Sequence, residues 1–138
     1  MGGRSGAQPK AGSISGCVTV CAEINPAAVK KRYAQGWVDE IINKIEELVL
    51  RVEKAKAAKE IVSIAYLGNI VDVWEYFYKN GIRVEMGSDQ TSLHNPWSGG
   101  YYPADLTFDE SNRLIKDDPQ LFAIKVQETL RRHVKAIN

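Results

Sequence analysis

The stretch IVSIAYLGN, residues 61–69, decides the fold. Its first seven residues form an uncharged run in which β-branched side chains recur, and this pattern predicts a buried strand over residues 61–67. Gly68 and Asn69 then turn the chain into an apolar helix over residues 70–79. A strand that runs directly into a helix is the repeating unit of α/β proteins.

The preceding segments predict the same alternation. CVTVCAE, residues 17–23, is expected to form a buried strand that ends at Glu23, and the glycine-rich segment before it is expected to form a turn and a short helix. From Trp37 to Val52, apolar residues recur at spacings of three and four, which predicts a helix with one buried face. Strands and helices therefore alternate along the first half of the chain.

The second half continues the pattern. Residues 82–86 predict a third strand, and two helices follow it. Thr107 and Glu110 have the spacing of a capping box, and Asp118 stands before a proline in the way of a residue that begins a helix. The last helix is expected to bury one face, formed by Phe122, Val126, Thr129, Leu130, His133, Val134 and Ile137.

Strands separated by helices predict a parallel sheet, since parallel neighbours need a crossover between them. We therefore expect an α/β fold with a Rossmann-like parallel sheet and flanking helices, in a single domain over residues 1–138. In such sheets ligands bind outside the carboxyl ends of the strands, so the informative residues follow positions 23, 67 and 86.

Composition excludes several classes of function. The 138 residues are 44% hydrophobic and 25% charged, which is typical of one soluble globular domain, and the net charge of +1 argues against a nucleic acid or a membrane surface as partner. Neither a membrane-spanning run nor a signal peptide is recognisable, so a cytoplasmic location is expected. Cys17, Cys21, His94 and His133 have no metal-binding spacing, and we expect reduced thiols and no metal site.

The glycine-rich start predicts dinucleotide binding. Gly3 and Gly6 fit the last two glycines of G-x-G-x-x-G, although Met1 occupies the place of the first. Glu23 follows Gly3 by twenty residues at a strand end, where a carboxylate can accept hydrogen bonds from an adenosine ribose. The alternative is a small-residue helix packed closely on a sheet, with a solvated glutamate.

In a dinucleotide-binding fold of this type a strand runs directly into the glycine loop, whereas this chain begins at the loop. Either the fold differs, or the chain is a segment of a longer protein that lacks its first strand. We favour the second interpretation.

The long segment 87–103 has the composition of a functional loop. Ser92 and His94 suggest a nucleophile and its base, but no acid is assignable to orient the histidine, and a structural or ligand-orienting hydrogen bond is the better interpretation of His94. We therefore assign no catalytic residue. The loop supplies donors, acceptors and flat apolar surface from Asp89, Gln90, Thr91, Ser92, His94, Asn95, Trp97, Tyr101 and Tyr102.

These same residues resemble a known family. GGRSGAQPKAG at 2–12, the strand that ends in Glu23, LGN at 67–69 and, above all, SDQTSLHNPWSGGYYPA at 88–104 resemble urocanate hydratase over nearly the whole chain. The resemblance is to the NAD-binding domain inserted in the middle of a much longer enzyme. It implies a cytoplasmic homodimeric hydro-lyase of histidine degradation.

The resemblance implies that the enzyme adds water to urocanate and gives 4-imidazolone-5-propanoate, with tightly bound NAD⁺ acting as an electrophile rather than as a hydride carrier. The family's catalytic cysteine and substrate pocket match nothing in this chain, so the chain alone is expected to be inactive. The cofactor NAD would therefore be held here, while urocanate would bind with the help of other parts of the parent enzyme.

Site residues follow from the resemblance position by position. One departure is Ala28, which stands where many bacterial members have an arginine five residues after the ribose-binding glutamate. Of the matching residues, Gly3, Arg4 and Ser5 would lie at the pyrophosphate, Glu23 at the adenosine ribose, Asn69 and Ile70 beside the adenine half, and Gln90, Thr91, Ser92, Leu93, His94, Tyr101 and Tyr102 toward the nicotinamide end.

Two alternatives stay open at this point. An NAD-dependent dehydrogenase domain would share the fold and Glu23 but would transfer hydride, and fold analogy does not separate it from a hydratase. A non-catalytic domain could instead use the aromatic residues at 97–102 to bind a protein partner. The motif at 88–104 favours the hydratase over the dehydrogenase, and a titration with NAD would separate the interaction domain from both.

Overall fold

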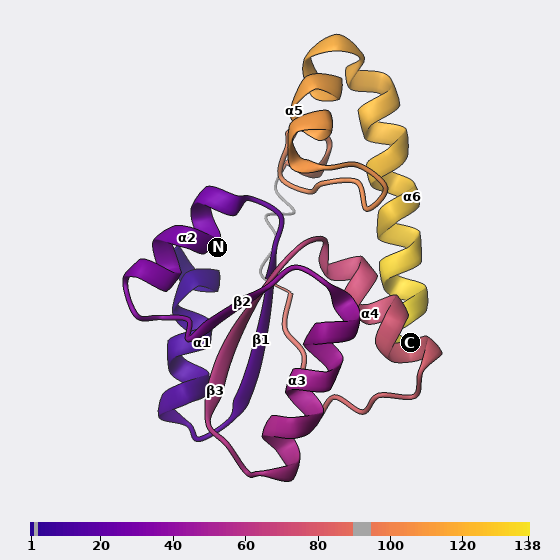
Figure 1. The fold of residues 1–138 in the computed structure, drawn as a ribbon. Helices are drawn as coiled ribbons and strands as arrows, with labels where there is room; N and C mark the ends of the chain where they lie inside the picture. The colour runs from indigo at the N-terminus through magenta and orange to yellow at the C-terminus, as the bar shows by residue number, and fades with distance from the viewer. Residues whose placement is uncertain (2, 90–94) are drawn as a thin grey trace. The chain divides into compact units, whose positions relative to one another are not determined.

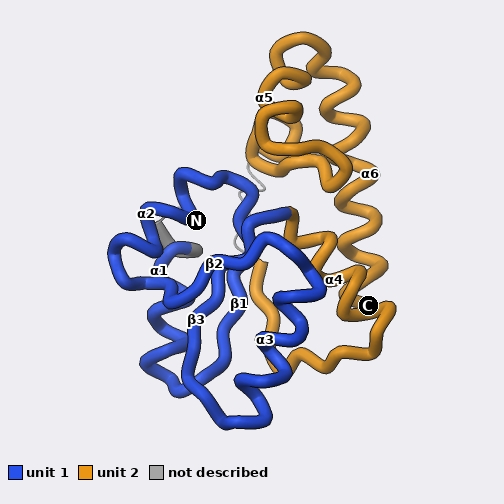
Figure 2. Tube along the Cα trace, viewed as in Figure 1, with its two compact units in different colours: residues 1–68 blue, residues 69–138 orange. Residues whose placement is uncertain are grey.

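A computed structural model describes residue 1, residues 3–89 and residues 95–138, with only the backbone described for residues 3–5. The chain divides into two compact units, Met1–Gly68 and Asn69–Asn138 (Figure 2). Each unit has a hydrophobic cluster of its own. The single domain predicted over residues 1–138 stays a prediction.

Within the described part of the first unit, three strands form one parallel sheet in the order β1-β3-β2 (Figure 1). The central strand is β3 (Val62–Leu67), which pairs with β1 (Val18–Glu23) on one side and with β2 (Glu40–Ile42) on the other. Residues 62–66 of β3 are all buried. The predicted α/β class with a Rossmann-like parallel sheet and flanking helices is confirmed.

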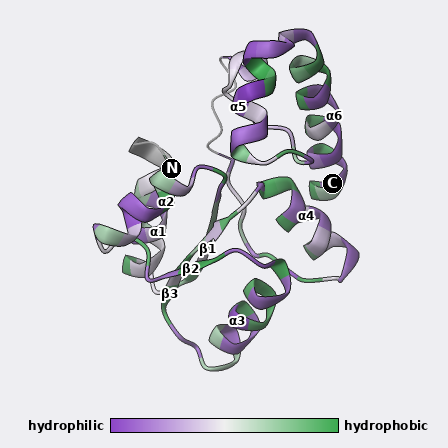
Figure 3. Ribbon diagram, turned by 45° about the horizontal axis from the view of Figure 1, so that its top comes forward, coloured by the Kyte–Doolittle hydropathy of each residue, from purple (hydrophilic) through white to green (hydrophobic). Residues whose placement is uncertain are grey.

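Helices cover the two faces of this sheet. α1 (Gly3–Ile14) and α2 (Pro26–Ala34) lie on one side, and α3 (Ile45–Ala57) lies on the other (Figures 1 and 3). Hydrophobic and hydrophilic residues alternate around α3 in Figure 3, and the side that it buries is formed by Leu48, Val52 and Ala55.

The helix predicted from Trp37 is wrong in its first part. Residues 40–42 form β2, and α3 begins only at Ile45. The apolar residues of this segment satisfy a helical spacing, but β3 has an edge that β2 fills with parallel pairing, and this tertiary interaction decides the local structure.

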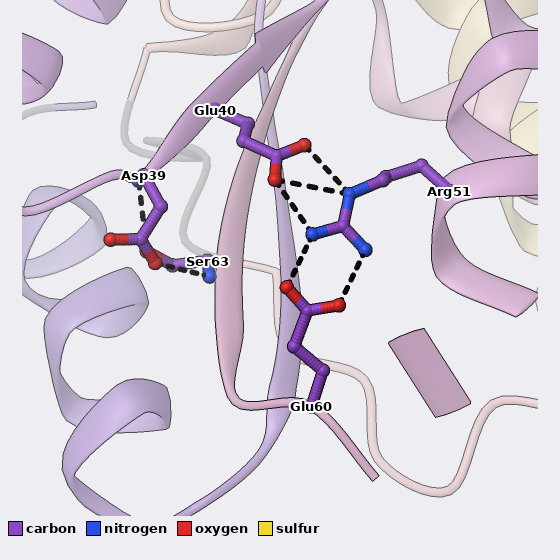
Figure 4. Close-up of polar contacts among 5 residues, drawn as sticks. All are labelled: Asp39, Glu40, Arg51, Glu60 and Ser63. Carbon is purple, nitrogen blue, oxygen red and sulfur yellow. Dashed lines mark hydrogen bonds and ion pairs between the residues drawn. The ribbon is translucent and has the colours of Figure 1, made fainter. Parts of the chain in front are cut away.

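Hydrogen bonds of polar side chains stabilise the position of β2 (Figure 4). The Asp39 carboxylate accepts hydrogen bonds from the backbone N–H of Ser63 at 2.8 Å and from its hydroxyl at 2.9 Å. On the other side, Arg51 of α3 donates to Glu40 and Glu60, and its hydrogen bonds to Glu60 and then to Glu40 raise the pKa of Arg51. The strand is therefore held from β3 and from α3.

The glycine-rich start contains less turn than predicted, because α1 already begins at Gly3 and runs for 12 residues. Gly12 lies where α1 meets β1. A Cβ at this position would collide with Thr19 Oγ1 and would lie 2.9 Å from Thr19 Cβ. The close approach of helix and strand therefore requires glycine at residue 12.

The second unit is helical in its described part. Its buried cluster is formed by Val71, Tyr101, Phe122 and Val126. Arg132 links the unit's elements, since its guanidinium donates two hydrogen bonds to Glu75 and one to Asp105, all at 2.7 Å. The elements are α4 (Ile70–Lys79), the 3-10 helix η1 (Pro96–Ser98), α5 (Phe108–Asp117) and α6 (Pro119–Ile137).

The helix caps predicted for this unit are confirmed. Thr107 and Glu110 form a complete capping box at the start of α5, and the Asp118 side chain accepts a hydrogen bond from Leu121 N at the start of α6. The predicted face of α6 is correct for Phe122, Val126, Thr129 and His133, which are buried, but wrong for Val134 and Ile137, which are more than half exposed. None of the described helices has the length and hydropathy needed to cross a membrane.

The third strand predicted over residues 82–86 is wrong. This segment has no regular structure, and Val84 and Met86 are 38% and 88% exposed. The alternation of apolar and charged residues is a strand signal only where a neighbouring strand and a core can use it. Residue 87 therefore does not follow a strand end, and the prediction that a ligand-binding segment begins after a strand at this point is wrong.

The approach of α1 to β1 can be tested with Gly12→Ala. We expect the free energy of unfolding to fall by about 1–3 kcal/mol, because the added methyl group overpacks the contact with Thr19. Thr19→Ala removes the colliding hydroxyl and should recover part of the loss in the double variant. Urea unfolding of the wild type, the two single variants and the double variant measures the coupling energy between residues 12 and 19. A Gly12→Ala protein as stable as the wild type would contradict the close packing.

Candidate functional site

The carboxyl ends of β1 and β3 lie side by side. Glu23 is paired with Leu67, and the backbone N–H of Gly68 donates to the Glu23 carbonyl oxygen at 3.0 Å. Both strands therefore end at one edge of the sheet, where Rossmann-like folds bind their ligands. This edge is the candidate site of the first unit.

The Glu23 side chain has a fixed position at this edge. It is 15% exposed, and its Oε1 accepts a hydrogen bond from the backbone N–H of Asn25 at 3.0 Å. Its Oε2 contacts the amino group of Met1. The Asn25 side chain in turn caps α2 by accepting from Ala27 N at 2.9 Å. The turn from β1 into α2 thus orients the carboxylate.

The start of α1 is suited to an anion. The first turn of the helix contains no acidic residue, and the N–H groups at a helix start have no partner within the helix and carry partial positive charge. Gly3, Arg4 and Ser5 form this turn, and their contact with a pyrophosphate stays a prediction. The contact of Glu23 with an adenosine ribose likewise stays a prediction.

Gly68 follows the end of β3, where there is no space for a side chain. A Cβ there would lie 2.9 Å from Cζ of the Tyr66 ring. The ring of the buried Tyr66 occupies the place that a side chain at residue 68 would take, so the packing of this strand end requires glycine.

In the second unit, Asn69 connects two segments of the predicted site. It is 9% exposed, its Oδ1 accepts from Val71 N at 3.0 Å and so caps α4, and its Nδ2 donates to the Tyr102 carbonyl oxygen at 2.9 Å. One amide therefore begins the helix and holds the 101–102 segment beside it. Ile70, the next residue, packs against the buried cluster.

The two tyrosines differ in exposure. Tyr101 is 2% exposed and belongs to the buried cluster, so the expectation that it offers open flat surface is wrong. Tyr102 is half-buried, donates to Asn112 Oδ1 at 2.8 Å and stacks near Phe108 with 5.5 Å between ring centroids. Their predicted contacts with the nicotinamide half stay predictions.

His133 is the buried partner of Tyr101. Its Nδ1 lies 2.7 Å from the Tyr101 hydroxyl and 3.9 Å from the Asp89 carboxylate, and its Nε2 has no hydrogen-bond partner among the described residues. Burial lowers the pKa of His133, while Asp89 opposes this by raising it. The imidazole is therefore held in its neutral form at pH 7.

Several predicted site residues lie outside the described residues: Gln90, Thr91, Ser92, Leu93 and His94, together with the side chains of Gly3, Arg4 and Ser5. Among the residues that the structure describes, no group of histidine, cysteine or acidic side chains could hold a metal ion. Both cysteines are free, and Cys17 is exposed, which is wrong for the buried strand start predicted there.

Sequence reasoning missed three features of the site. The helix α2 was not predicted, although Asn25 before Pro26 is the same cap signal that was used at Asp118. Arg32 and Trp37, which stack on each other at 4.7 Å, were not recognised as neighbours of the glycine segment, because nothing local in the sequence shows a contact with residue 1.

Comparison with known proteins gives a consistent result. The family model described as the urocanase Rossmann-like domain matches residues 1–138. The chain belongs to the urocanase family. It is 53% identical to a probable urocanate hydratase of Dictyostelium discoideum and 50% identical to one of Caenorhabditis elegans, with all of this chain covered in both.

The urocanate hydratase of Mus musculus is 46% identical, again over the whole chain. The chain spans about a fifth of the length of these curated relatives. The resemblance stated from residues 2–12 and 88–104 is therefore confirmed, and within the urocanase family this chain corresponds to the Rossmann-like domain, a fold that commonly binds nucleotide cofactors.

The environment of His133 makes the stability of the protein depend on pH. Because burial lowers the folded-state pKa, the unfolded state binds more protons once the pH falls below about 6.5, and the free energy of unfolding should decrease until the pH passes the folded-state pKa. His133→Gln keeps an acceptor for Tyr101 but cannot titrate, so its stability should change less between about pH 7 and pH 5. Urea unfolding of both proteins across this pH range measures the effect. If the free energy of unfolding changes equally with pH in the wild type and in His133→Gln, the lowered pKa of His133 is not its cause.

Proposed function

We propose that this chain is the NAD-binding part of a urocanate hydratase, a cytoplasmic homodimeric hydro-lyase that converts urocanate and water into 4-imidazolone-5-propanoate in histidine degradation. The observation that supports it most is the Glu23 carboxylate, oriented at the carboxyl end of β1 by the Asn25 N–H. The printed names of the relatives, which are urocanate hydratases, support the activity of the full-length protein.

Each predicted contact has a chemical reason. Glu23 accepts hydrogen bonds from the adenosine ribose hydroxyls, and the backbone of Gly3, Arg4 and Ser5 donates to the pyrophosphate. Bound NAD⁺ supplies an electrophilic nicotinamide ring and is not consumed. The contribution of this chain is to hold and orient the dinucleotide, which is the usual contribution of a protein to a cofactor reaction.

The resemblance supports further contacts: Asn69 and Ile70 with the adenine half, and Tyr102 and the segment 90–94 with the nicotinamide half. Tyr101 is buried in the hydrophobic cluster, so it supports this part of the site from the core. Proton transfer and substrate binding belong to residues that match nothing in this chain.

Glu23 is the first residue to test. Glu23→Ala in the full-length protein should weaken NAD affinity by about 10- to 100-fold, because charge-assisted hydrogen bonds contribute about 1.5–3 kcal/mol. Glu23→Gln, which keeps the size but accepts more weakly, should lie between. The carboxylate also repels a 2′-phosphate, so the wild type should prefer NAD over NADP and the alanine variant should show a smaller preference.

Calorimetric titration of cofactor-free protein with both dinucleotides measures these effects. Glu53→Ala, which removes an exposed glutamate of α3 on the opposite side of the sheet, is the matched control and should bind as the wild type does. If Glu23→Ala binds NAD as tightly as the wild type and discriminates equally well against NADP, Glu23 is a strand-end residue without a role at the ribose.

The reaction type is tested by following NADH. The full-length protein should consume urocanate while the absorbance band of NADH stays flat, because the proposal gives the cofactor an electrophile's role. Added NAD should raise activity only in protein from which the cofactor has been removed. Accumulation of NADH in step with product would show hydride transfer instead, and the electrophile role proposed for NAD⁺ would be wrong.

A further inference from the structure

Two cations lie over one aromatic ring beside the glycine-rich start of the chain. The Arg32 guanidinium of α2 lies 4.7 Å from the centre of the Trp37 ring, and Lys10 Nζ of α1 lies 5.8 Å from it. Arg32 and Trp37 are both half-buried, whereas Lys10 is exposed. The planar guanidinium can stack on the indole face, which restricts its orientation.

The hydrogen bonds of Arg32 point it at the peptide that precedes the glycines. Nε and Nη2 both donate to the Met1 carbonyl oxygen, at 3.4 and 3.3 Å, and Nη1 donates to Gln35 Oε1 at 2.9 Å. Residue 1 is therefore held at its carbonyl by Arg32.

The guanidinium also lies directly against the first turns of α1. A Cβ at Gly6, which is buried, would come within 2.6 Å of Arg32 Cζ. Only glycine lets the arginine approach so closely. Because the first turn of α1 contains no acidic residue, its side chains place no anion against this positive charge.

We propose that Arg32, supported by Trp37, is a positioning residue for the phosphates of the dinucleotide. It fixes the Met1 carbonyl beside the first turn of α1, so that the backbone N–H groups of that turn stay directed at the diphosphate. The inference rests on the proposed function and adds to it two residues, Arg32 and Trp37, that neither the family resemblance nor the spacing of the glycines assigns.

A purely structural role predicts a different result. If the stack only stabilised the packing of α2 on the sheet, its loss would weaken every ligand of the site to a similar extent. If it positions the phosphate-binding backbone, its loss weakens only ligands that carry the diphosphate. Ligand selectivity therefore separates the two roles.

The test is Arg32→Met in the full-length protein, freed of cofactor and titrated with NAD, ADP-ribose and adenosine. Methionine keeps the length of the side chain but donates no hydrogen bond. We expect NAD and ADP-ribose to bind on the order of 10-fold more weakly, since the backbone contacts to an anion are charge-assisted, and adenosine to bind unchanged. Lys31→Met, a neighbouring exposed cation of α2, is the control and should leave all three affinities unchanged.

Conservative variants give a second measurement. Arg32→Lys keeps the positive charge and can still donate to the Met1 carbonyl, but it lacks the planar guanidinium. Its NAD affinity should therefore lie between those of the wild type and Arg32→Met. Trp37→Phe keeps an aromatic face for the cation, whereas Trp37→Leu does not, and NAD affinity should fall more in the leucine variant. If Arg32→Met does not fold, these three variants decide the question.

Two results would overturn the inference. One is unchanged NAD affinity in Arg32→Met, and the other is a loss of adenosine affinity as large as the loss of NAD affinity. Failure of the wild type itself to bind NAD is a distinct result, because it would overturn the proposed function and this inference with it.

Discussion

The parallel pairing of β1 with β3 is the constraint on which the rest of the first unit depends. It sets Glu23 opposite Leu67, and the Gly68 N–H extends the pairing by one more hydrogen bond to the Glu23 carbonyl. Two segments that are distant in the sequence are thereby brought to one sheet edge. The turn through Asn25 and the start of α2 are built from that same edge, so the carboxylate and the cap depend on one register.

Both polar atoms of the Asn69 side chain have a structural role. Its Oδ1 accepts the hydrogen bond that caps α4, and its Nδ2 donates to the Tyr102 carbonyl oxygen. A substitution there would remove the cap and release the neighbouring segment together, so the effects on stability and on binding cannot be separated at this residue. Glu23 and Arg32 are better suited to that purpose, since both are half-buried, whereas Asn69 is buried.

The elements predicted correctly are those whose signals are local. β1 and β3 are short apolar runs between glycine or proline, and α5 and α6 begin at side chains that bond within three residues. β2 was missed because Val38, Ile41 and Ile42 fit a helical face as well as a strand, and only pairing with β3 distinguishes them. The strand predicted over residues 82–86 is the opposite case. The local alternation of residues indicates a strand, but no neighbouring strand pairs with this segment among the described residues.

The same distinction explains which parts of the candidate site the sequence could predict. Glu23 was found because its distance from the glycines is a property of the chain, whereas Arg32 acts through the Met1 carbonyl, a contact across 31 residues that no spacing rule describes. A carboxylate accepts hydrogen bonds from ribose hydroxyls but repels a phosphate, so the proposed contribution of Glu23 is confined to the ribose. The guanidinium of Arg32 is engaged with a backbone carbonyl, so in the proposal it serves the phosphates only by holding the backbone that donates to them.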